Sequence, residues 1–90
     1  MENSKANRMQ VLAEALWAAE NTTDEAIAKT AYLVADMITA RQEHRVAATV
    51  DAKAHAKLAE AQAHLSAARM ALVEAHNEMN EVKLRLGVRT

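Results

Sequence analysis

The chain has 90 residues, a formal net charge of −1, no cysteine, no proline and a single glycine. This length allows one domain, residues 1–90, and the lack of cysteine excludes disulfides and thiolate metal sites. Hydrophobic residues make up 51% of the chain, but 22 residues are alanine, so side chains that can fill a core are scarce. A chain this small with so little core material is expected to gain stability by association.

The first predicted element is a helix over about residues 4–20. Apolar residues from Met9 to Ala19 repeat at steps of three and four, which is the spacing of one helical face. Shortly afterwards, Thr22 and Glu25 have the spacing of a capping box, a pattern that marks the start of a helix. The sequence therefore predicts that one helix ends near residue 20 and that another begins near residue 23.

The second predicted element is a long helix over about residues 23–86, which Gly87 is placed to terminate. Its weakest stretch is 41–53, where Thr49 or Asp51 could cap a new helix after a break near 49–51. Short connections between helices usually contain glycine, proline or asparagine, and this stretch has none. The sequence therefore favours one continuous helix, with a helical hairpin as the alternative.

Two further features concern burial. Residues 26–40 are apolar nearly all round the helix, so this segment is expected to be the most buried part of the chain. Trp17 is the one tryptophan, and it is expected either to close the edge of the core or to act as a binding residue.

An unbroken seven-residue repeat marks the C-terminal half of the chain. Large residues occupy one position of the repeat, and small residues follow three positions later. This period is typical of a helix that buries one seam against another helix. The predicted interface consists of Leu58, Ala61, Leu65, Ala68, Leu72, Ala75, Met79, Val82 and Leu86. The expected fold is all-α: a short N-terminal helix and a long helix, or a helical hairpin, that form a coiled-coil or helical-bundle oligomer.

The sequence contains no motif for catalysis, a cofactor or a metal. No two of the four histidines, His44, His55, His64 and His76, have the four-residue spacing that places two imidazoles over one ion. We therefore expect no enzymatic activity, no cofactor and no bound metal. The expected function is protein interaction, by a small structural or adaptor subunit or a protein inhibitor. Its expected partners are itself, as a homodimer or higher oligomer, and another protein.

The alternative function is that of a dimeric nucleic-acid-binding regulator. Arg41, Arg45, Lys53 and Lys57 come nearest to a basic stripe, but acidic residues interrupt them, so nucleic acid is not the expected partner. No stretch approaches the roughly 20 uncharged residues of a membrane span, and no export signal is visible. The expected localisation is cytoplasmic, with no membrane partner.

Overall fold

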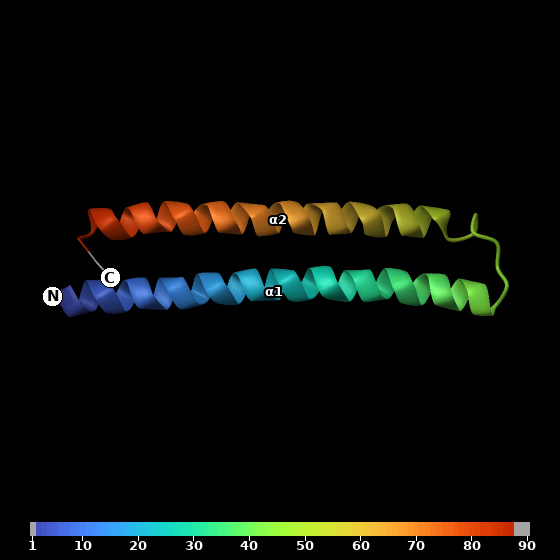
Figure 1. Cartoon of the computed structure of the whole chain (residues 1–90), viewed down its shortest axis with the longest axis horizontal. Coiled ribbons are helices and arrows are strands. Elements are labelled where there is room, and N and C mark those ends of the chain that lie inside the picture. Colours follow the sequence, from blue (N-terminus) through green and yellow to red (C-terminus); the bar gives the residue numbers. More distant parts are fainter. Residues whose placement is uncertain (1, 88–90) are drawn as a thin grey trace.

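The computed structural model describes residues 2–87, which form two long helices and one connection. Helix α1 spans Glu2–Glu43, and helix α2 spans Ala52–Arg85. The helices lie side by side and run antiparallel, with the connection at one end and the start of α1 beside the end of α2 at the other (Figure 1). The described part contains no strand, so the all-α class is confirmed for it.

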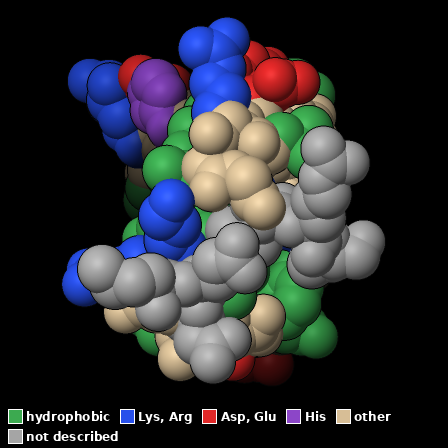
Figure 2. All heavy atoms as spheres, turned by 90° about the vertical axis from the view of Figure 1, so that its left-hand side faces the viewer, with side chains coloured by type: hydrophobic (Ala, Val, Ile, Leu, Met, Phe, Trp, Pro, Cys, Tyr) green, Lys and Arg blue, Asp and Glu red, His purple; other side chains and the backbone are tan. Residues whose placement is uncertain are grey.

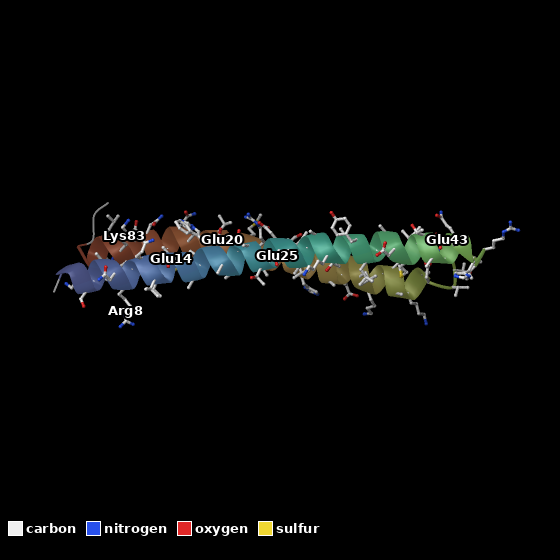
Figure 3. The ribbon with its side chains drawn as sticks, turned by 90° about the horizontal axis from the view of Figure 1, so that it is seen from below. Arg8, Glu14, Glu20, Glu25, Glu43 and Lys83 are labelled. Atoms are coloured by element: carbon white, nitrogen blue, oxygen red, sulfur yellow. The ribbon has the colours of Figure 1, made fainter. Side chains whose placement is uncertain are left out.

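The hairpin is narrow and elongated. Its principal extents are 66 × 16 × 14 Å, and its radius of gyration is 20.0 Å. A compact domain of this length has a radius of gyration of about 12 Å. Seen from below, the two helices cross near their middle, as in the shallow packing of coiled coils (Figure 3).

The predicted boundary between residues 20 and 23 is wrong, because α1 continues through it without a break. Thr22, the predicted cap, lies inside this helix and caps nothing. The hydroxyl of its neighbour Thr23 donates a hydrogen bond of 2.8 Å to the carbonyl of Ala19, one turn earlier. Thr30 bonds the carbonyl of Ala26 in the same way. Threonine and asparagine in a helix interior cost only about 0.7 kcal/mol each relative to alanine, which packing along the whole of α2 offsets.

The predicted continuous helix over 23–86 is also wrong, and the alternative hairpin is the observed arrangement. The chain leaves the helix after Glu43 and enters α2 at Ala52, so the connection is somewhat longer than the expected break near 49–51. A single helix of that length would leave its leucine row in water. Reversal at the stretch that lacks large apolar residues places that row against α1.

Helix α1 ends in a Schellman motif built on Arg45 in place of the usual glycine. Arg45 has a φ of 54°, in the left-handed region, and its amide donates to the carbonyl of Gln42 over 3.0 Å. The amide of Val46 donates to the carbonyl of Arg41, also over 3.0 Å, which completes the motif. A side chain with a Cβ is strained in this conformation, so arginine here costs stability.

We expect Arg45→Gly to raise the free energy of unfolding by up to about 1 kcal/mol, because relief of the left-handed strain exceeds the added flexibility of the unfolded chain. The matched control is Arg8→Gly, at an exposed position inside α1. That change should lower the free energy of unfolding by about 0.5–1 kcal/mol. Urea titration followed by circular dichroism measures both changes, and a loss of stability in Arg45→Gly would contradict the motif.

At the other end of α2, Gly87 has a φ of 80° and its amide donates to the carbonyl of Leu84 over 3.0 Å. The prediction that Gly87 terminates the last helix is therefore confirmed, and a residue with a Cβ would be strained there.

Within the described part, only Met9 is buried, with 7% of its surface exposed. The expectation that residues 26–40 are the most buried segment is wrong. Tyr32 and Leu33 in that segment are 71% and 52% exposed, and its most covered residues are only half-buried. Two helices can shield only one side of each other, so a segment that is apolar all round keeps most of its surface in water.

Candidate interaction surface

The large half of the predicted seam faces α1 inside the hairpin. Leu58, Leu65, Leu72 and Met79 are all half-buried, at intervals of one heptad along α2. A two-helix hairpin can cover a side chain only between its helices. These four residues therefore form the contact between α2 and α1 rather than a surface that a partner could reach directly.

The small half of the seam lies at the edge of that contact. Ala61 and Ala75 are half-buried, whereas Ala68 and Val82 are exposed, as is Leu86 beyond the end of α2. A residue three positions after a leucine of the row is turned by about 60° away from it around the helix. The predicted interface is thus divided between the inside of the hairpin and its surface.

The matching rows on α1 were not identified from the sequence. The residues of α1 that are half-buried or buried include two rows at seven-residue spacing, one of them Met9, Leu16, Thr23, Thr30 and Met37, and the other Ala13, Glu20, Ile27, Val34 and Arg41. The seven-residue spacing of these rows is present in the sequence, but two threonines, a glutamate and an arginine interrupt the apolar pattern that would reveal it. The period of seven on both helices agrees with coiled-coil packing.

One side of the hairpin carries interhelical ion pairs. Arg69 donates two hydrogen bonds to Asp24, from Nε to Oδ1 over 2.8 Å and from Nη2 to Oδ2 over 3.3 Å. Nearby, Nδ1 of His76 lies 3.4 Å from Oε2 of Glu20. The hydrogen bonds and charge of Arg69 hold the pKa of Asp24 below its ordinary value of 3.8. These contacts join the two helices and mark the antiparallel register of α1 against α2.

The sign of that pKa shift predicts a pH-dependent effect. Because the pKa of Asp24 is lower in the folded chain, its carboxylate stabilises the fold at neutral pH and loses this effect as pH falls below 3.8. We expect Asp24→Asn to lower the melting temperature slightly at pH 7 and to have no effect at about pH 2. The effect should shrink with added salt because the pair is exposed. An equal difference in melting temperature at both pH values would contradict this role.

A shallow hollow of about 360 Å³ lies at the open end of the hairpin. Its lining includes Trp17, Met9 and Leu16 from α1 and His76 and Met79 from α2. Trp17 is 51% exposed, so it stands at the edge of the helix contact and is not a buried core residue. Hydrophobic side chains reach the molecular surface at this end among the charged ones (Figure 2).

The other side of the hairpin is apolar. On α1, the residues three positions after Met9 and the other members of its row are turned about 60° from the helix contact. Asp24, one position after Thr23, is turned about 100° in the opposite direction. On α2, the residues three positions after each leucine are turned one way around the helix. Arg69, four positions after Leu65, is turned the other way. Since Asp24 and Arg69 meet on one side, both rows lie on the other.

We call this side the apolar face. It consists of Leu12, Ala19, Ala26, Leu33 and Ala40 of α1 together with Ala54, Ala61, Ala68, Ala75 and Val82 of α2. Neither row contains a charged or polar side chain. The face includes four of the nine residues in the predicted interface. Its α1 half was not predicted, because the repeat from Met9 to Ala19 counts Leu12 and Leu16 on the same helical face.

The basic cluster of the nucleic-acid alternative lies around the connection. Nε of Arg41 is 3.0 Å from Oδ2 of Asp51, both atoms are shielded from solvent, and neither makes a hydrogen bond with acceptable geometry. Nη1 of Arg41 donates to the carbonyl of Val46 over 3.1 Å. Arg41 therefore ties the turn to both helix ends. Of the other cations in the cluster, Lys57 pairs with Glu60 over 3.0 Å.

Among residues 2–87, no three His, Cys, Asp or Glu side chains are grouped closely enough to hold a metal ion. In the same range, neither α1 nor α2 combines the length and the apolarity that crossing a membrane requires. Comparisons with protein-family models, with curated proteins and with solved structures found no match to this chain.

Proposed function

We propose that this protein is a non-enzymatic protein–protein interaction module, a small helical structural or adaptor subunit or a protein inhibitor, and that it associates with itself. The observation that carries the proposal is the amount of apolar surface on a chain with almost no core. Twelve large hydrophobic side chains in the described part are exposed, against the single buried one, Met9. Three of the twelve, Leu12, Leu33 and Val82, lie on the apolar face. An apolar surface gathered on one side of a protein is typical of interaction sites.

The total surface area supports the same proposal. A compact protein of 9.8 kDa exposes about 5,200 Å² by the usual scaling of area with mass. This hairpin exposes 7085 Å². The difference, roughly 1,900 Å², is surface that a globular chain of the same mass would cover. Covering it with another helical surface would supply the hydrophobic stabilisation that the isolated hairpin lacks.

The distribution of titratable groups favours interaction over catalysis. Catalytic groups need a sheltered site that perturbs their protonation. Asp24 and Arg69 shift each other's pKa values through their hydrogen bonds and charges, and they form an exposed pair that joins the helices. That pair joins the two helices at the surface and does not form a sheltered site.

The ion pairs of the connection favour protein interaction over nucleic-acid binding. A phosphate-binding surface needs cations that are free to approach the backbone of the nucleic acid. Arg41 and Lys57 are each engaged with a carboxylate of the chain itself. The other two cations, Arg45 and Lys53, make only a small basic surface. We therefore expect no nucleic-acid complex at physiological salt.

Light scattering coupled to gel filtration tests the proposed self-association. At tens of micromolar, we expect a mass of at least two chains, with one chain being 9.8 kDa. The mass should fall on dilution if the complex is reversible. A mass of one chain over the whole concentration range would contradict the proposal.

Fluorescence anisotropy with labelled DNA and RNA tests the alternative. We expect no binding near physiological salt. The informative variant replaces Arg41, Arg45, Lys53 and Lys57 by alanine. Binding by the wild-type chain that this variant loses, with an affinity that falls steeply as salt rises, would replace protein interaction by nucleic-acid recognition as the function.

A further inference from the structure

We propose that the apolar face binds the same face of a second copy, so that two hairpins form an antiparallel four-helix bundle. This inference rests on the proposed self-association and names the surface that produces it. In this bundle the leucine row of each α2 and the apolar face of each hairpin would form one continuous core. Each helix would then touch two neighbours, as in other four-helix bundles.

The two rows of the face match each other from Leu12 and Val82 at one end to Ala40 and Ala54 at the other. The pair between Asp24 and Arg69 marks the register, so residues at equal distance before Asp24 and after Arg69 lie at about the same level. Leu12 thus lies near Val82, and Ala26 lies near Ala68. Every level of the face from one end to the other is therefore apolar.

The shape of the apolar face also suits a second copy. Alanines occupy the middle of the face, where their small side chains let two helices approach closely. Larger residues flank this middle: Leu12 and Val82 stand at one end of the face, and Leu33 stands one heptad beyond Ala26 on the other side. They are 40%, 50% and 52% exposed. A two-fold axis through the middle brings the same surface of both copies together. A self-complementary surface of this kind suits an isologous dimer.

The exposed area of the hairpin is large enough for such an interface. An obligate homodimer buries about 2,000–5,000 Å² in total, or about 1,000–2,500 Å² from each copy. The hairpin exposes roughly 1,900 Å² more than a compact chain, counted over all its sides, so it has enough excess surface for an interface of this size on one of them. A second copy of this chain has the length, the register and the apolar rows to cover it.

The opposite side of the hairpin is a poorer surface for a second copy. It carries the pair between Asp24 and Arg69 and the contact between Glu20 and His76. Burying the charges of Asp24 and Arg69 against another apolar surface would cost desolvation that their mutual attraction does not fully repay. Trp17 lies on that side and should remain accessible in the dimer.

Two neighbouring alanines provide a matched test. Ala68 lies on the apolar face, whereas Ala67, one residue earlier, is exposed on the outer side of α2, and both are in the middle of the helix. Ala68→Glu places a charge in the proposed interface, and Ala67→Glu adds the same charge to a solvated surface. Sedimentation equilibrium should show a dimer dissociation constant raised about 100-fold or more by Ala68→Glu and changed less than about threefold by Ala67→Glu.

A second measurement covers the case in which Ala68→Glu fails to fold. The chain has no cysteine, so Ala68→Cys and Ala67→Cys each introduce a single thiol at an alanine with little change in volume. At concentrations where the dimer forms, a maleimide should label the thiol of Ala68→Cys at least tenfold more slowly than that of Ala67→Cys, with the difference lost on dilution. Acrylamide should quench the fluorescence of Trp17 equally at concentrations where the dimer forms and after dilution to the monomer.

The outcomes separate this inference from the proposed function. Dimers that Ala68→Glu leaves intact, equal labelling of the two thiols, or protection of Trp17 on dimerisation would each show that the copies meet through another surface. Self-association would then stand and the apolar face would be the wrong site. A wild-type chain that stays monomeric at every concentration would overturn both proposals.

Discussion

Replacing Leu65 and Leu72 together by aspartate should abolish the helical hairpin. Both leucines are half-buried between α2 and α1 near the middle of the contact. Each should contribute roughly 1.5 kcal/mol or more through burial, and each aspartate adds the cost of a charge in an apolar contact. The stability of a chain this short is on the order of 5 kcal/mol, so the two changes together should exceed it. Circular dichroism at 25 °C should show the loss of most helical signal.

The matched control places the same charges on the outer surface of the same helix. Ala63 and Ala67 are both exposed, so Ala63→Asp with Ala67→Asp should keep the helical signal and lower the melting temperature only through helix propensity. A leucine variant that melts like this control would mean that the leucine row is not the contact between the helices.

A proline should be tolerated in the connection and should disrupt α2. The amide of Val50 donates to the carbonyl of Ala47 over 3.0 Å, which makes Ala48 the second residue of a four-residue turn, a position that proline favours. We expect Ala48→Pro to leave the melting temperature unchanged or to raise it, because proline restricts the unfolded chain. In contrast, Ala67→Pro should cost about 3 kcal/mol or more by removing a helical bond and clashing with the preceding turn.

Both proline variants are followed by thermal melting with circular dichroism. A clear drop in melting temperature for Ala48→Pro, similar to that for Ala67→Pro, would indicate that the helix runs through residue 48. The chain would then be a rod and not a hairpin.

The sequence predicts α2 well because its periodicity and its terminator agree. The leucine row from Leu58 to Met79 repeats every seven residues without interruption, and Gly87 supplies the left-handed residue that ends the helix. Each signal comes from a physical need, namely burial of one seam and a backbone conformation that glycine adopts freely.

The reversal of the chain could not be located from local signals. The residue in left-handed conformation is Arg45, which has no special preference for it, and the capping pattern at Thr22 and Glu25 lies inside a continuous helix. In both places the contact between the helices decides the outcome. Burying the leucine row offsets about 1–2 kcal/mol of backbone strain and the small cost of threonines in α1.

The candidate surface was only half predictable for a similar reason. The period of seven identifies Ala61, Ala68, Ala75 and Val82, but it does not tell whether a second helix of the same chain already covers the seam. That answer depends on the position of the turn and on the register, which Asp24 and Arg69 mark across the hairpin. The row that begins at Leu12 becomes part of the surface only once that register is known.

Small-angle X-ray scattering at tens of micromolar tests the central claim, a hairpin that associates side by side, most directly. One curve gives both the mass and the maximum dimension of the particle. We predict a mass of two chains with a maximum dimension close to the 66 Å length of one hairpin. A particle with the mass of one chain would contradict the account. A maximum dimension of about 95 Å or longer, which a continuous helix or an end-to-end pair of hairpins would produce, would also contradict it.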